Sequence, residues 1–91
     1  MEIHNNFKPG DIISVAQELG KEVQTFTGRF IRTNFSIMRL EPIDVEKEFP
    51  GAYSEEEKEQ VTQFLVHKPT LLDMDSIKLI FIVKEYKENG S

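Results

Sequence analysis

Cysteine is absent from this sequence of 91 residues, which excludes both a disulfide-stabilised fold and a thiolate metal site. The stability of so short a chain must therefore come from packing, with self-association as a further source. Long apolar runs are missing as well, since no stretch approaches the roughly 20 residues that span a bilayer. The first residues, MEIHNNFKPG, lack the pattern of a secretory signal. Together these absences predict a cytoplasmic protein that does not bind membranes.

Enzyme motifs are missing too. No glycine-rich phosphate loop, nucleophile elbow or H-E-x-x-H pattern occurs. His4 and His67 are far apart in the chain, and a histidine at a strand end is ordinarily structural. Asp73 and Asp75 could converge to hold a cation or act as acid and base, but turn formation accounts for them better. We therefore predict no enzyme, no catalytic residue, no metal and no cofactor.

The charge of the chain is unevenly distributed. The formal net charge is −5, yet residues 44–59 hold seven acids and two bases, while the remainder balances nine of each. Arg29, Arg32 and Arg39 all fall within eleven residues of the balanced part. These arginines could form a local cationic surface. The simpler interpretation is an acidic solubilising insertion beside ordinary surface arginines.

Turn residues mark the start of the folded domain. In the segment KPGD, residues 8–11, the proline presets φ and the glycine allows a positive φ. Residues 1–10 are therefore predicted to be a lead-in, and residues 11–86 to form a single domain. Residues 87–91, which end in Asn-Gly-Ser, are predicted to be a disordered tail.

The segment after the lead-in admits two interpretations. Residues 12–19 could form a short helix capped by Asp11 and ended by Gly20. The β-branched content and the turn at residues 19–22 favour a strand instead.

Two further strands follow. Residues 23–33, VQTFTGRFIRT, predict a long strand with a bulge or bend at Gly28, which would let it serve both sheets of a small barrel. A tight turn is expected at Asn34. Residues 35–43 then predict a strand that ends near Pro42, because proline cannot donate to a sheet ladder.

Residues 44–60 break the β pattern and are interpreted as an acidic insertion. Ser54 and Glu57 form a capping-box signal for a short helix within it. Strand composition returns at residues 61–66 and again at residues 77–83, IKLIFIV. This last run is apolar on both faces, and a strand of that kind needs a cover, which in so short a chain suggests a partner subunit.

Arginines and aromatic side chains alternate in residues 26–35, FTGRFIRTNF. Proteins bind single-stranded RNA by stacking bases on aromatic rings while cations contact phosphates. Core packing accounts for two of the three phenylalanines, which leaves Phe35, at the turn, as the ring expected to be exposed. The segment therefore predicts an RNA-binding surface that includes Arg29 and Arg32.

Residues 20–41, GKEVQTFTGRFIRTNFSIMRLE, resemble the first motif of the Sm-like family, which includes the LSm proteins and bacterial Hfq. In that motif a glycine turn precedes a strand with a central glycine, a loop with Asp or Asn, and a strand ending in Leu-Glu. Residues 72–80, LDMDSIKLI, are similar to the short second motif. Two features depart from the family. The first loop is one residue shorter, and Met74-Asp75 stands where LSm proteins have Arg-Gly and Hfq has Lys-His.

The resemblance implies an all-β fold, a small, strongly bent five-stranded barrel of the SH3-like or Sm-like type with a short helical or loop insertion. It also implies a homo-oligomer, a ring of six or seven subunits, that binds single-stranded RNA. The RNA-facing loop would then fall on Thr33, Asn34, Phe35 and Ser36, with Asn34 bonded to a base and Phe35 stacked on one. The alternative is a structural or adaptor barrel whose strand edges and acidic insertion bind a protein partner, without nucleic-acid activity.

Overall fold

The computed structural model describes residues 7–87, which contain five strands and three short helical elements. The strands are β1 (Ile12–Leu19), β2 (Glu22–Asn34), β3 (Ile37–Glu41), β4 (Thr70–Asp73) and β5 (Ile77–Lys84). The helical elements are α1 (Val45–Glu48), α2 (Glu55–Thr62) and the 3₁₀ turn η1 (Met74–Ser76). Most of the predicted lead-in, with His4, and most of the predicted tail lie outside the described residues.

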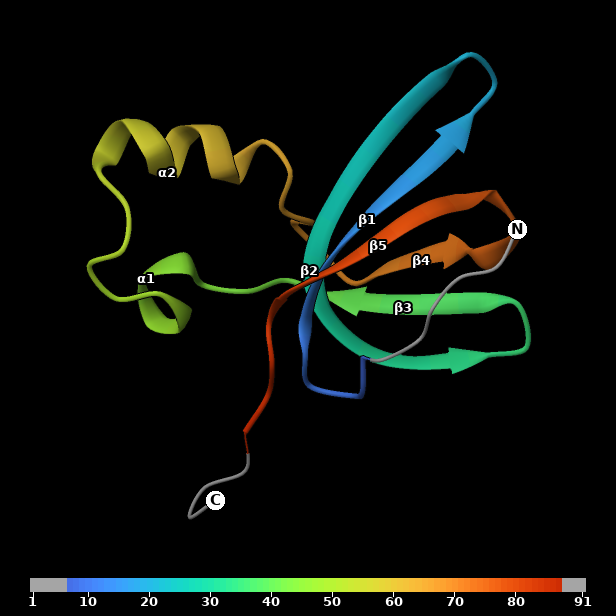
Figure 1. Cartoon of the computed structure of the whole chain (residues 1–91), viewed down its shortest axis with the longest axis horizontal. Coiled ribbons are helices and arrows are strands. Elements are labelled where there is room, and N and C mark those ends of the chain that lie inside the picture. The colour runs from blue at the N-terminus through green and yellow to red at the C-terminus, as the bar shows by residue number, and fades with distance from the viewer. Residues whose placement is uncertain (1–6, 88–91) are drawn as a thin grey trace.

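The five strands form one antiparallel sheet in the order β4-β3-β2-β1-β5. Strand β2 is long and strongly curved, and it pairs with β1 along its first half and with β3 along its second half (Figure 1). Strands β4 and β5 form the two edges, and the sheet is not closed into a barrel. The prediction of a five-stranded β-rich fold is confirmed, and the closed barrel is not.

Residues 12–19 form strand β1, so the strand interpretation is confirmed and the helix is excluded. Strand β1 is followed by the two-residue turn Gly20-Lys21, which places Leu19 opposite Glu22. Gly20 has a φ of 65°, a left-handed conformation that glycine adopts without steric cost. Together the β-branched side chains and this turn favour a hairpin over a helix.

Asp11 is not a helix cap but a buried link between the two ends of the domain. Its carboxylate accepts hydrogen bonds from the backbone N–H of Lys8 at 2.9 Å and of Tyr86 at 2.7 Å, and its side chain is fully buried. Burial by itself would raise the pKa of this carboxyl group. The hydrogen bonds from Tyr86 and Lys8 outweigh burial, so the pKa of Asp11 is lowered. The charged carboxylate is therefore the form that stabilises the fold.

Gly28, in the middle of β2, allows close approach of two other segments. A Cβ atom at this position would lie 2.8 Å from the carbonyl oxygen of Glu41 and 2.9 Å from a methyl carbon of Val66. Any larger residue would push β3 or the chain after α2 away from β2. The glycine predicted to mark a bend thus stands where three segments meet.

The turn between β2 and β3 consists of Phe35 and Ser36, one residue beyond the turn predicted at Asn34. Strand β3 ends at Glu41, directly before Pro42, as expected for a residue that lacks an N–H donor. Strand β3 is shorter than the predicted strand of residues 35–43, because Phe35 and Ser36 form the turn and Pro42 follows its last residue.

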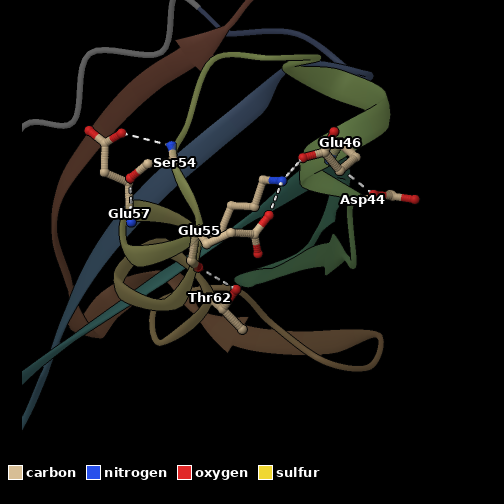
Figure 2. A network of polar contacts seen from close by, with 7 residues as sticks. Asp44, Glu46, Ser54, Glu55, Glu57 and Thr62 are labelled. Carbon is tan, nitrogen blue, oxygen red and sulfur yellow. Dashed lines mark hydrogen bonds and ion pairs between the residues drawn. The ribbon is translucent and has the colours of Figure 1, made fainter.

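Helices α1 and α2 lie to one side of the sheet (Figure 1). The predicted capping box is confirmed, since the backbone N–H of Glu57 donates to Oγ of Ser54 at 3.2 Å and the N–H of Ser54 donates to Oε1 of Glu57 at 2.8 Å (Figure 2). The hydrogen bond from the backbone N–H of Ser54 to the Glu57 carboxylate is the main cause of the lowered pKa of Glu57. Asp44 caps α1 in the same manner, accepting from the N–H of Glu46 at 3.0 Å.

Lys58 links the two helices of the acidic segment. Its ammonium group pairs with the carboxylate of Glu46 in α1 and lies 3.2 Å from Oε1 of Glu55 in α2. The hydrogen bond to Glu46 is the main cause of the raised pKa of Lys58. Part of the acidic charge is therefore neutralised within the segment, while Glu56 and Glu59 face solvent.

The strand predicted at residues 61–66 is wrong. Helix α2 continues to Thr62, and Leu65 forms a single parallel bridge with Thr27 of β2. The capping box at Ser54 starts a helix, and each additional helical residue costs little once the first turn has formed. Val66 is still buried in the core, which explains the apolar pattern of this stretch.

The core gathers on one face of the sheet, where alternate residues of the strands pack together. Phe30 of β2 also makes an edge-to-face contact with Phe7, at 4.8 Å between ring centroids. The buried cluster consists of Ile13, Val15, Phe30, Met38, Leu40, Val66, Leu72 and Ile77.

Strand β5, predicted to be apolar on both faces, is only partly covered. Ile77 is buried and Ile80 is half-buried, but the side chains of Leu79, Phe81 and Val83 are 54%, 58% and 43% exposed. The strand pairs with β1 alone within the described structure. A partner subunit over this strand stays a prediction.

Candidate functional site

A β-bulge in β2 places the three arginines on one face of the sheet. Arg29 pairs with Glu41 and Arg32 pairs with Arg39, which leaves Ile31 as an extra residue. Side chains three residues apart on a regular strand point to opposite faces, and one extra residue reverses that relation. Arg29 and Arg32 therefore share the face that carries Arg39.

Arg29 is held by two partners. Its Nη1 donates to the carbonyl oxygen of Gly10 at 2.7 Å, and its Nη2 lies 2.6 Å from Oε2 of Glu48. The ammonium group of Lys84 lies 3.7 Å from the other oxygen of the Glu48 carboxylate. Arg29 therefore connects β2 to α1 and to the turn before β1, and its charge is already compensated.

Arg32 and Arg39 lie opposite each other on neighbouring strands, but their surroundings differ. Nε and Nη2 of Arg39 lie 2.8 Å and 2.7 Å from Oε2 of Glu41. Arg32 is exposed and forms no ion pair with any of residues 7–87. Since Glu41 compensates Arg39, repulsion across the strands is reduced, and Arg32 presents its positive charge to solvent.

Phe35 occupies the turn in a conformation that a bulky residue rarely adopts. Its φ is 58°, in the left-handed region, which costs an L-residue about 1 kcal/mol or more. The side chain is 96% exposed, which confirms the expected exposure and means that packing does not offset this cost. The carbonyl oxygen of Ser36 accepts a hydrogen bond from the N–H of Met74 at 2.8 Å, which holds the turn against η1. Phe35 therefore combines backbone strain with an exposed ring, which makes it a candidate binding residue.

A groove of about 330 Å³ lies beside this turn. Three strands and the turn contribute its lining residues, which are Arg32, Asn34, Phe35, Ile37, Arg39 and Leu71. Three of the six predicted site residues, Arg32, Asn34 and Phe35, thus share one groove. Thr33 and Ser36 adjoin it without lining it, and the guanidinium group of Arg29 is engaged elsewhere.

Three lining residues were not predicted as part of the site. Phe35, Ile37 and Arg39 alternate along the chain, so this alternation could have identified Ile37 and Arg39. Leu71 lies opposite Arg39 in the register of β3 and β4. No local signal points to Leu71, because 34 residues separate it from the turn in the sequence.

The loop that resembles the second family motif is a hydrogen-bonded turn. Oδ1 of Asp73 accepts from the backbone N–H of Asp75 at 2.9 Å, and the hydroxyl of Ser76 donates to the carbonyl oxygen of Asp73 at 3.0 Å. The side-chain amide of Gln17 donates to Oγ of Ser76 at 3.0 Å, which fixes the turn to β1. This arrangement agrees with the turn-forming interpretation of the two aspartates.

Within residues 7–87, His, Cys, Asp and Glu side chains nowhere gather in a group of three or more that could hold a metal ion. The helices in this part of the chain fall short of the length and apolar character that a membrane span requires. Comparisons with protein-family models, with curated proteins and with solved structures found no match.

Proposed function

We propose that this protein binds single-stranded RNA in the groove beside the turn between β2 and β3. The observation that carries the proposal is the exposed ring of Phe35 beside the charge of Arg32 and the amide of Asn34. An aromatic ring stacks on any base, a guanidinium pairs with a phosphate, and an amide both donates to and accepts from a base edge. These groups together are sufficient to hold one nucleotide.

The rest of the groove supports the same ligand. Ile37 and Leu71 are 40% and 66% exposed and extend the apolar surface next to Phe35. Arg39 adds a second guanidinium, although Glu41 compensates its charge. A groove of this size contacts only one or two nucleotides, so useful affinity requires several copies that act together.

We further propose that such copies are joined in an Sm-like ring of six or seven subunits. In the order β4-β3-β2-β1-β5, each of the edge strands β4 and β5 is paired on one side only. The unpaired N–H and C=O groups on the other side of an edge strand are a template for pairing with another chain. The exposed side chains of Leu79, Phe81 and Val83 favour the same contact. In the proposed ring, β4 of one subunit pairs with β5 of the next, and the barrel is completed between subunits.

The mass in solution tests the ring. We expect light scattering on a sizing column to give about six or seven times the chain mass of 10.6 kDa. A monomer or dimer at micromolar concentration would contradict the ring, and with it the repeated groove.

Titration with RNA tests the groove. We expect Phe35→Ala and Arg32→Ala each to weaken binding of a fluorescein-labelled oligouridine about tenfold in an anisotropy assay, since stacking on one base contributes about 1–3 kcal/mol. Added salt should weaken binding further. Phe64→Ala is the matched control, because Phe64 is also an exposed ring but lies outside this groove. Equal affinities of Phe35→Ala and the unaltered protein would contradict the proposal.

The adaptor function predicted as an alternative is tested in the acidic segment. Helix α2 buries none of its residues, and its acids therefore face solvent. Replacing Glu55, Glu56 and Glu59 by glutamine keeps the ion pair of Glu48 with Arg29, which a deletion of the segment would remove. In this variant the affinity for RNA should stay equal or increase. Binding of a protein partner that recognises these acids would be lost.

A further inference from the structure

The first half of β2 has an open edge. Residues 22–29 pair with β1 on one side, whereas β3 occupies the other side only from Arg29 onward. On that other side, the N–H of Thr27 donates to the carbonyl oxygen of Phe64 at 2.7 Å, and the N–H of Val66 donates to the carbonyl oxygen of Thr27 at 2.9 Å. The chain after α2 therefore covers the edge at Thr27 and leaves the residues before it uncovered.

Val23 and Thr25 continue this edge. Backbone groups of alternate residues in an antiparallel strand point to the same side, so these residues direct their N–H and C=O groups as Thr27 does. Neither residue forms a backbone hydrogen bond on that side with any part of the chain that the structure describes. Both residues are exposed. Two donors and two acceptors are thus available in one line.

A groove of about 600 Å³ runs along this open edge. Its walls are the first half of β2 and the segment of residues 63–68. The apolar part of the lining comes from Val23, Phe26, Phe64, Leu65 and Val66. Val23 and Phe64 are 61% and 48% exposed, so the groove offers apolar surface to an occupant. An apolar groove beside unpaired backbone groups is the arrangement that binds an extended peptide.

The charge of the groove indicates the chemistry of that peptide. No carboxylate lines it, although the chain has 16 acids against 11 bases. Lys68 and His67 lie at the groove, and Lys68 forms no ion pair with any of residues 7–87. A carboxylate on the peptide would therefore find a cation without competition from a neighbouring acid.

We propose that this groove binds an extended, acidic peptide segment of another protein, which adds to β2 as a further strand beside Val23 and Thr25. Its apolar side chains alternate with polar ones and face the groove, and an Asp or Glu lies next to Lys68. Backbone hydrogen bonds supply affinity, while the apolar walls and Lys68 supply specificity. The proposal does not depend on RNA binding, because the turn that carries Phe35 is at the other end of β2 (Figure 1).

The probe that tests the proposal is an acetylated octapeptide of alternating valine and threonine with aspartate at one end, made with the aspartate at either terminus. One of these peptides should bind the full chain in an anisotropy titration. At saturation, amide hydrogen exchange at Val23 and Thr25 should slow at least about tenfold, because each N–H gains a hydrogen bond. The same peptide with alternate backbone nitrogens methylated should neither bind nor slow exchange, since it cannot join a strand ladder.

Two substitutions locate the site. Thr25→Pro removes one free N–H without removing a bond to β1, and should weaken binding of the octapeptide about tenfold. Thr25→Val keeps the N–H and should leave the affinity unchanged. Lys68→Glu should weaken binding of the acidic peptide about tenfold and strengthen binding of a lysine-ended peptide. Lys47→Glu, which makes the same charge change in α1, is the control.

Three results would overturn the proposal. The first is that neither octapeptide slows exchange at Val23 and Thr25. The second is that protection appears on the edges of β4 or β5 instead. The third is that Val23 and Thr25 become protected without peptide as the protein concentration rises, since a second copy of the chain would then occupy the groove. The comparison of plain and methylated peptides uses the unaltered protein, so it decides the matter even if Thr25→Pro does not fold.

Discussion

The two halves of β2 differ in what they offer to a partner. The half that pairs with β3 presents side chains on its face, Arg32 and Asn34 with Phe35 at the turn, and β3 occupies the edge that is open in the other half. The half before Gly28 presents backbone groups along its edge, beside a groove. The bulge and the close approach at Gly28 separate the halves. One bent strand can therefore carry two chemically distinct surfaces, because its neighbours change along its length.

Gly28, at the junction of the two halves, gives the largest expected effect. In Gly28→Ala the new Cβ would meet a backbone oxygen at 2.8 Å, which cannot move without displacing β3. We expect the free energy of unfolding, measured in urea, to fall by about 3 kcal/mol. Gly51→Ala is the matched control, because Gly51 has a φ of 71° but open space around its Cα, and it should cost only about 1 kcal/mol. Equal losses would mean that the junction relaxes freely.

Asp11 anchors the half of β2 that pairs with β3, since its carbonyl oxygen accepts from the N–H of Phe30 at 2.8 Å. The pKa of Asp11 lies below its ordinary value of 3.8, so its stabilising effect is fully present above that value and is lost as the pH falls through the lowered pKa. We expect Asp11→Asn to cost about 2 kcal/mol at neutral pH and to flatten the acid dependence of the unfolding free energy below about pH 4.

Urea titrations at several pH values measure this dependence. Asp44→Asn serves as the control, because Asp44 is an exposed cap of a four-residue helix and should change the acid dependence little. If Asp11→Asn kept the acid dependence of the unaltered protein, Asp11 would not be the group that titrates.

Arg29 and Arg32 share a face, but replacing Arg29 should affect stability, whereas replacing Arg32 should affect RNA binding. We expect Arg29→Gln to lower the free energy of unfolding by about 1 kcal/mol, because Glu48 and the carbonyl oxygen of Gly10 lose a charged partner. Arg32→Gln should change stability by less than about 0.5 kcal/mol but weaken RNA binding. Urea unfolding and RNA anisotropy on both variants measure the contrast. In double-mutant cycles with Glu48→Gln, the effects on the unfolding free energy should be non-additive for Arg29→Gln and additive for Arg32→Gln. Non-additive effects for Arg32→Gln would contradict the pairing of Glu48 with Arg29.

Phe35 gives a small expected effect on stability, and one of opposite sign to that of Arg29. Phe35→Gly removes the left-handed strain, so the protein should become more stable by about 0.5 kcal/mol after the greater flexibility of glycine in the unfolded chain is counted. RNA binding should fall in the same variant. Phe35→Asn, a residue that tolerates a positive φ, should behave alike in both assays. A loss of stability in Phe35→Gly would reveal that the ring packs against another part of the protein.

Local chemistry made several features predictable. The capping box at Ser54, the hairpin turn after β1 and the exposure of Phe35 each depend on residues close together in the sequence, and each is confirmed. The strand predicted at residues 61–66 is wrong, because the apolar pattern of these residues does not come from their local conformation. Its apolar pattern reflects contacts with β2, which is distant in the sequence, while the local helix signal decided its conformation.

The candidate site divides in the same way. Arg32, Asn34 and Phe35 were predictable as a group because they lie within four residues at one turn. The engagement of Arg29 was not, since its partners, Gly10 and Glu48, lie nineteen residues away on either side.

The sequence by itself therefore determined the β-rich character of the chain, most of its strands and the exposed residues of its turn, because short-range preferences of side chains and backbone govern these features. The tertiary structure alone decided which arginine has no ion pair among residues 7–87, which residue of β4 joins the groove and where β2 keeps an open edge. Those properties depend on the bulge at Ile31 and on the register of distant strands. They arise only when segments far apart in the chain compete for the same hydrogen bonds and the same space.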